Sequence, residues 1–190
     1  MKNIESIVGI ILLLLSGSLE KLPYILGGKK AAIANLPFQV AIVVKQHPYG
    51  KWLKGGGTIV TTRLVISSAS IIIYISEKMF TNGFVYVHAN SAYWKNGTSH
   101  EVTDKYTHPR FSETTFDHDI AVVQVKTPFN GEYEKPIKLA AKSYKVKSNK
   151  AIISGWGTKT HYPVQLEDRL QKLNVAIIKH NDCKKIYRWV

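Results

Sequence analysis

The stretch TRLVISSASIIIY, residues 62–74, places four small residues between two runs of apolar, mostly β-branched side chains. The small residues are Ser67, Ser68, Ala69 and Ser70. β-Branched runs favour strands, because their side chains pack well on a pleated surface. Small side chains at the end of such a run leave space for a neighbour. We therefore expect a strand end that lies against another part of the protein.

Strand-like runs recur along the whole chain, with turn-forming sequences such as TNG, KNG and FNGEYEKP between them. This pattern is typical of an all-β sandwich or barrel. The predicted strands are 38–44, 58–67, 84–89, 119–125, 151–154 and 170–178. No segment before residue 180 shows sustained helical periodicity, and the ending HNDCKKIYRWV predicts a short helix capped by Asn181 or Asp182.

The length of 190 residues fits one domain or two small lobes that share a core. With 45% apolar residues, the chain has enough hydrophobic surface to fold as a globular protein. The segment TPFNGEYEKPIKLAA concentrates turn formers and charge, so we place a boundary near residues 128–138. The first unit then covers residues 25–130 and the second covers residues 131–190.

The N-terminus has the layout of a secretory signal. Lys2 precedes an apolar run from Ile7 to Leu15, and small residues follow up to Ser18. The run is too short to cross a bilayer, which needs about 20 apolar residues. We predict a signal peptide over residues 1–18, a propeptide-like segment over 19–24 and a secreted, extracellular protein. An uncleaved membrane anchor is the alternative.

Two residues carry predictions about the exported protein. Asn96-Gly97-Thr98 is a sequon, which suits a glycosylated surface loop. Cys183 is the only cysteine, although exported proteins usually carry an even number. Either the partner of Cys183 was lost, or Cys183 pairs between two chains.

The chain is strongly basic, with 26 Lys and Arg against 13 Asp and Glu. Residues 135–190 carry thirteen basic and three acidic residues, a net charge of +10. Such a field favours acidic partners such as sulfated glycans, anionic membranes or acidic proteins, or simply gives a well-solvated surface. Of these we retain acidic glycans, and we predict neither a nucleic-acid partner nor membrane association. The seven histidines show no metal-ligand spacing, so no metal or cofactor is expected.

Four stretches, in order, resemble the trypsin and chymotrypsin-like serine protease family. They are YILGGKKA (24–31), GGGTIVTTRLVISSAS (55–70), THPRF with DHDIAVVQV (within 107–125) and ISGWGT (153–158). The resemblance runs from Ile25 to nearly the C-terminus. It implies two antiparallel six-stranded β-barrels with the active site between them. We expect this double barrel with an incomplete second barrel and a short C-terminal helix.

The resemblance also places the catalytic residues. The histidine position falls on Ser70, whose hydroxyl cannot act as a general base near neutral pH. The aspartate position falls on Asp119. We expect Asp119 to be a buried carboxylate without its imidazole, joined to Ser70 through an ordered water.

The family's nucleophile would lie about 93 residues after Asp119, and no Gly-Asp-Ser-Gly-Gly sequence occurs in the chain. The resemblance therefore implies a protein without peptidase activity, even with histidine restored at Ser70. The alternative interpretation is an enzyme with residual peptidase activity.

Other family features are altered as well. Tyr24 precedes Ile25 at the activation junction, where the family generally has Arg or Lys, so a trypsin-like activator would not recognise it. A family disulfide would join the positions of Gly55 and Ile71, and both cysteines are replaced. Cys183 matches a family cysteine whose partner would lie beyond Val190.

These features together predict a secreted, inactive serine protease homologue that acts by binding other proteins. It looks like the inactivated protease paralogues of parasitic mites, and its partners would be proteases or immune-cascade proteins. Such binding would interfere with proteolytic cascades, complement among them. The alternatives are a basic polyanion-binding module and a fragment of a longer, active serine endopeptidase.

Overall fold

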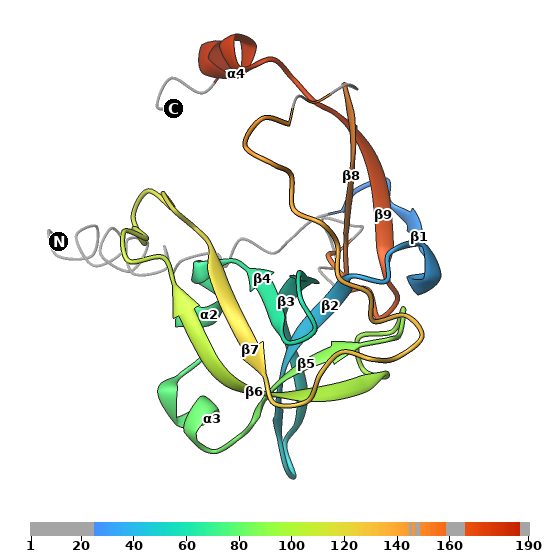
Figure 1. Ribbon diagram of the computed structural model, residues 1–190, viewed down its shortest axis with the longest axis vertical. Coiled ribbons are helices and arrows are strands. Elements are labelled where there is room, and N and C mark those ends of the chain that lie inside the picture. The colour runs from blue at the N-terminus through green and yellow to red at the C-terminus, as the bar shows by residue number, and fades with distance from the viewer. Residues whose placement is uncertain (1–24, 145, 147–148, 159–165, 187–190) are drawn as a thin grey trace, which may run out of the picture.

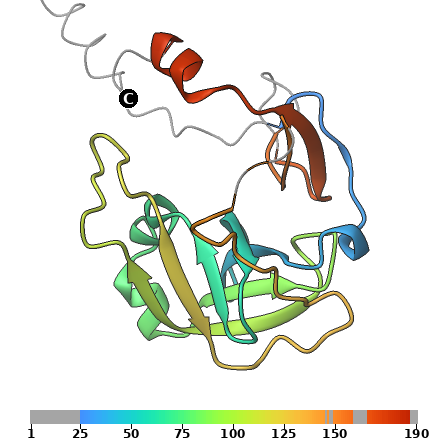
Figure 2. The same cartoon turned by 45° about the horizontal axis from the view of Figure 1, so that its top comes forward.

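The computed structural model describes residues 25–144, 146, 149–158 and 166–186 (Figure 1). The predicted signal peptide, the propeptide-like segment and Tyr24 lie outside these residues. The ribbon has two β units, a barrel and a smaller sheet, and Figure 2 shows the same division from a second direction.

The first unit is a closed barrel of six antiparallel strands, in the order β2-β3-β4-β7-β6-β5. The strands are β2 (Gln39–Gln46), β3 (Gly50–Ile59), β4 (Leu64–Ser67), β5 (Val85–Ala89), β6 (Thr98–Thr107) and β7 (Ala121–Val125). Along β7, buried and half-buried residues alternate, as expected for a strand with one face toward a core. Closing the sheet removes the exposed edges that an open sheet would have.

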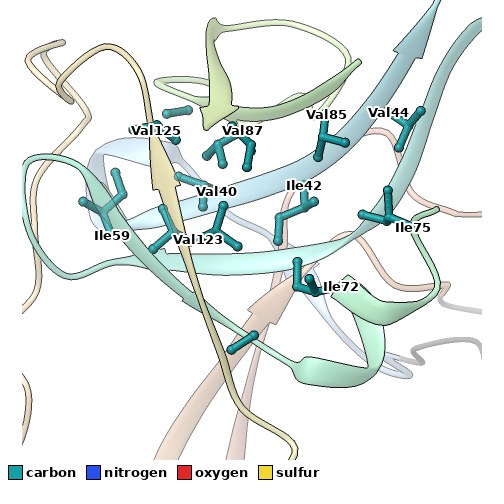
Figure 3. Packing of buried hydrophobic residues seen from close by; sticks show 14 of the residues in the cluster. Val40, Ile42, Val44, Ile59, Ile72, Ile75, Val85, Val87, Val123 and Val125 are labelled. Carbon is teal, nitrogen blue, oxygen red and sulfur yellow. The ribbon is translucent and has the colours of Figure 1, made fainter. Parts of the chain in front are cut away.

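Strand β2 is buried on both faces. Val40, Ile42 and Val44 point into the barrel (Figure 3), where they join the main hydrophobic cluster. Their neighbours Ala41 and Val43 belong to a second cluster. That second cluster also contains Ala31, Ile33, Leu36, Trp94, Trp156 and Leu170. Successive side chains of a strand point to opposite faces, so β2 contributes to two cores.

The second unit is a three-stranded sheet with the order β1-β9-β8. Its strands are β1 (Lys29–Lys30), β8 (Lys150–Gly155) and β9 (Gln171–Ala176), followed by helix α4 (His180–Ile186). Together the two units confirm the predicted all-β class, with a complete first barrel, a partial second one and a short C-terminal helix. Helix α4 begins at His180 rather than after Asn181 or Asp182, so the predicted cap is wrong.

Two short helices and one 3-10 turn were not expected from the sequence. They are η1 (Ile33–Asn35), α2 (Ala69–Ile73) and α3 (Glu77–Thr81). Each has at most five residues, which is too short for the periodicity that identifies a helix. Helix α2 begins at Ala69, so Ile71–Ile73 are helical and do not continue the strand.

Strand boundaries also differ in the first barrel. The predicted strand 58–67 is the end of β3 and the whole of β4, joined by a turn in which Thr61 Oγ1 accepts a hydrogen bond from Leu64 N at 3.0 Å. Strand β6 was not predicted, because its sequence TSHEVTDKYT is largely polar. At one of its inward positions, a buried His100 stands where an aliphatic residue would be usual.

Candidate functional site

Ser70 lies in the first turn of α2, which follows the end of β4. The hydroxyl of Ser67 at the end of β4 donates to the carbonyl of Gly56 at 2.9 Å, and Ala69 is fully buried. Strand β4 pairs with β7, with Ser67 opposite Ala121. This pairing brings Asp119, two residues before β7, to the start of α2.

The two residues at the predicted catalytic positions are in direct contact. Ser70 Oγ donates to Asp119 Oδ2 at 2.9 Å, and the backbone N–H of Ser70 donates to Asp119 Oδ1 at 2.7 Å. The prediction of a bridging water is wrong, because the serine hydroxyl reaches the carboxylate itself. The expectation that Asp119 is buried is also wrong, since this residue is half-buried.

The contact has a clear chemical consequence. An ionised carboxylate only accepts hydrogen bonds, so the hydroxyl hydrogen of Ser70 is directed at Asp119. The two serine donors occupy one carboxylate oxygen each, which offsets the cost of partly removing the charge from water. The arrangement satisfies the carboxylate but contains no imidazole that could take up a proton near neutral pH.

Two histidines on the neighbouring loop do not supply that imidazole. The rings of His108 and His118 stack on one another, with centroids 4.5 Å apart and planes 13° apart. His108 Nδ1 accepts a hydrogen bond from Arg110 N at 3.2 Å. Desolvation, His118 and Arg110 lower the pKa of His108. Within the described part of the chain, neither ring makes a hydrogen bond to Asp119.

Gly55 and Ile71, at the positions of the replaced disulfide, are close neighbours. A Cβ atom added at Gly55 would lie 2.3 Å from Ile71 Cδ1 and 2.9 Å from its Cγ1. The isoleucine side chain therefore occupies the space beside the glycine. The two replacements complement each other in volume.

Three other predicted sites have definite places in the fold. Ile25 is buried, and its backbone N–H donates to the carbonyl of Thr158 at 2.9 Å. Asn96 is exposed on the loop between β5 and β6. Cys183 lies in α4, half-buried and without a disulfide.

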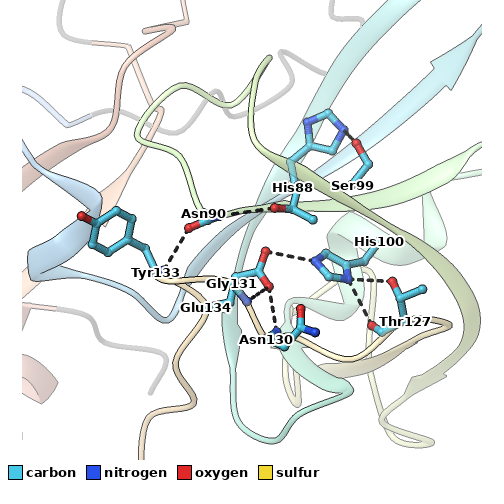
Figure 4. A network of polar contacts seen from close by, with 10 residues as sticks. His88, Asn90, Ser99, His100, Thr127, Asn130, Gly131, Tyr133 and Glu134 are labelled. Atoms are coloured by element: carbon cyan, nitrogen blue, oxygen red, sulfur yellow. Dashed lines mark hydrogen bonds and ion pairs between the residues drawn. The ribbon is translucent and has the colours of Figure 1, made fainter.

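Two buried histidines carry polar networks that sequence reasoning missed (Figure 4). His100 Nε2 lies 3.2 Å from Glu134 Oε1, and both side chains are buried. Glu134 Oε2 accepts the backbone N–H groups of Asn130 and Gly131 at 2.9 and 2.7 Å. This network fastens residues 130–134 to the barrel. The second network, around His88, shares no hydrogen bond with the Ser70 site.

The described residues contain no helix long and apolar enough to span a bilayer. They also contain no group of three or more His, Cys, Asp or Glu side chains placed to hold a metal ion.

The fold is shared with solved structures of serine proteases and their relatives. The structure of scabies mite inactivated protease paralogue S-D1 matches with a TM-score of 0.72 and 24% identity, covering 86% of this chain and 67% of that one. Mouse neuropsin, a serine protease, matches with a TM-score of 0.70 and 26% identity, covering 87% of this chain and 70% of that one. The protein therefore has the trypsin-like serine protease fold.

Sequence comparison gives the family. The family model named Trypsin matches residues 25–189, so the chain belongs to the trypsin family. Trypsin Tyr p 3.0101 of Tyrophagus putrescentiae is 26% identical over 166 residues, which are 86% of this chain and 55% of that protein. A trypsin of Simulium vittatum is 29% identical over 162 residues, which are 84% of this chain and 63% of that protein. The chain thus spans less than two thirds of the length of either relative.

Proposed function

We propose that the protein is a secreted, catalytically inactive member of the trypsin family that acts by binding other proteins. The observation that carries the proposal is the hydrogen bond of 2.9 Å from Ser70 Oγ to Asp119 Oδ2. The general base of this family would lie at Ser70, and a serine hydroxyl is no base near neutral pH. The proposal rests on a residue inside the chain, so it does not depend on where the sequence ends.

The expected loss of activity is large. A positioned general base contributes typically about 10²–10⁴-fold to the rate of a catalysed step. In the serine protease mechanism the histidine also returns the proton to the leaving amine. Ser70 can do neither, because its only hydroxyl hydrogen is directed at Asp119.

The rest of the fold supports a role in binding. The barrel is closed, and the space beside Gly55 is filled by Ile71. A folded, rigid protease scaffold without a working site can compete with a protease for a partner or hold a partner in place. The scabies mite structure with the same fold is described as an inactivated protease paralogue. We infer protein partners among proteases and immune-cascade proteins, and interference with proteolytic cascades as the outcome.

A panel of fluorogenic peptides tests the absence of peptidase activity. We expect the purified chain and the variant S70H to release no fluorophore above a matched S70A variant. Turnover by the unchanged chain above a buffer blank would overturn the proposal, whether or not S70A lowers it. Pull-down with purified cascade proteases, with the isolated partner identified by mass spectrometry, tests the binding role.

Binding of a sulfated polysaccharide is a second candidate function, favoured by the strand register of the small sheet. Lys29 of β1 lies directly opposite Lys172 of β9, so two like charges share one face. Such a pair destabilises a sheet unless an anion lies close to it. Retention on a heparin column to well above physiological salt would support this function, and elution below that salt would refute it.

A further inference from the structure

Three polar side chains meet on the outer face of the barrel, on strands other than those that hold Ser70. Strand β5 pairs with β6 so that His88 lies directly opposite Ser99. Strand β2 pairs with β5 so that Ala41 lies opposite His88. Lys45 is four residues after Ala41 and therefore on the same face. His88 is buried, whereas Ser99 is exposed.

The direction of each hydrogen bond in this group is fixed by chemistry. His88 Nδ1 lies 2.8 Å from the carbonyl oxygen of Trp94, which can only accept, so Nδ1 carries the ring hydrogen. The other nitrogen, Nε2, is then an acceptor in the neutral ring. Lys45 Nζ can only donate, and it lies 2.6 Å from Ser99 Oγ. The hydroxyl hydrogen of Ser99 is left to point at His88 Nε2, 3.2 Å away (Figure 4).

The charge state of His88 suits the role of an acceptor. Burial lowers the pKa of His88 to about 4; the bond to the Trp94 carbonyl opposes this shift, and the nearby Lys45, Lys51 and His100 add to it. The ring is therefore neutral near pH 7, and the lone pair on Nε2 is available. The ammonium of Lys45 lies beside the serine oxygen, where it favours negative charge on that atom.

We propose that Ser99 is a nucleophilic site that accepts acyl groups from small activated esters. A nucleophile within hydrogen-bonding reach of a base, itself oriented by a third group, is the arrangement that activates a hydroxyl. Here the three parts are Ser99, His88 and the Trp94 carbonyl. The site shares no residue with the Ser70 and Asp119 pair, so the proposal is independent of the proposed function.

The reaction at Ser99 balances without a further reagent. Ser99 Oγ forms a bond to the acyl carbon of the ester, and the bond from that carbon to the leaving oxygen breaks. The serine proton passes to His88 Nε2 and then to water, because burial disfavours a charged imidazole. The products are an acyl-serine, the free alkoxide or phenoxide and one released proton.

Incubation with p-nitrophenyl acetate, followed by intact-mass measurement and peptide mapping, tests this proposal. We expect one acetyl group on Ser99 and release of one equivalent of p-nitrophenolate with it. The variant S99A should lose this adduct. The variant H88Q should slow it by at most about 100-fold, the low end for loss of a general base, because a pKa of about 4 makes His88 a weak base. Glutamine keeps a donor for the Trp94 carbonyl and an acceptor for Ser99, and far-UV circular dichroism checks that H88Q is folded.

The chain provides matched controls for the reactivity of a serine hydroxyl. Ser70 donates to a carboxylate, and Ser91 Oγ accepts the backbone N–H of Tyr93 at 3.0 Å, without an imidazole in either hydrogen bond. Neither serine should be acetylated at a rate comparable to that of Ser99, and S91A should react as the unchanged chain does. The variant K45M, on the outer face of the barrel, should slow acetylation of Ser99 while leaving the barrel core intact.

Two results would overturn the proposal: acetylation of Ser99 no faster than that of Ser70 and Ser91, or an unchanged rate in H88Q. Either result leaves the absence of peptidase activity standing, because peptide cleavage is measured separately. Conversely, peptide cleavage that S99A does not affect would refute the proposed function and leave the reactivity of Ser99 intact.

Discussion

A double-mutant cycle at Gly55 and Ile71 tests whether the two residues replace a disulfide by complementary packing. In G55A the new methyl group would lie 2.3 Å from Ile71 Cδ1, far inside van der Waals contact. Overpacking of this kind costs about 1–3 kcal/mol of unfolding free energy. In I71A the lost side chain is half-buried, so we expect about 2 kcal/mol, at the low end for such truncations.

The double variant G55A/I71A shows whether the losses in G55A and I71A come from competition for one space or arise independently. Its added methyl group enters the space that the truncated isoleucine leaves, so it should lose at least about 1 kcal/mol less than the two single variants together. Urea unfolding, followed by tryptophan fluorescence and far-UV circular dichroism, gives the three free energies. Additive losses would show that the two side chains do not compete for one space and would refute the reasoning.

Three further predictions concern buried and exposed sites. Burial alone would raise the pKa of Glu134, but hydrogen bonds from the backbone N–H of Gly131 and from the side chains of His100 and Thr98 hold it below its ordinary value. The carboxylate therefore stabilises the fold above its unfolded pKa of about 4.3. This contribution is lost as the pH falls through the folded pKa. E134Q should therefore lower the unfolding free energy by about 1–3 kcal/mol at pH 7 and flatten its fall below pH 4.5 in urea titrations; an unchanged pH profile would contradict the network. Expression in a secreting eukaryotic host should add a glycan that peptide-N-glycosidase removes and that N96Q lacks, and an unmodified mass would show that the sequon is not used. Non-reducing electrophoresis decides between the two states expected for Cys183: a disulfide-linked dimer that C183S abolishes shows pairing between chains, and a monomer under oxidising conditions rules it out.

The sequence predicted those parts of the fold whose pattern is local. VISSAS marked a strand end, and the resemblance placed Ser70 at the position that contacts Asp119. The contact itself was predicted with a water in between, because the distance between two side chains cannot be read from their separation in the sequence. Strand β6 was missed because His100, at an inward position, is satisfied by Glu134, a residue 34 positions away.

The site around Ser99 was beyond sequence reasoning for a related reason. His88 and Ser99 meet only in the register of the β5 and β6 hairpin, which the turn between the two strands decides. Lys45 enters through the separate pairing of β2 with β5. No spacing in the sequence predicts that three residues on three different strands lie close together. Because β6 itself was not predicted, a search of the sequence could not have brought His88 and Ser99 together.

Strand β2 makes the two hydrophobic clusters a single unit in unfolding. Its inward residues hold the barrel, and Ala41 and Val43 hold the cluster that contains Trp156 and Leu170. Opening β2 exposes both clusters at once, so its amide hydrogens should exchange only through global unfolding. The small sheet then gains protection from exchange that its own few contacts could not give, and a substitution at Val43 should weaken that protection on β9 as well as on β2.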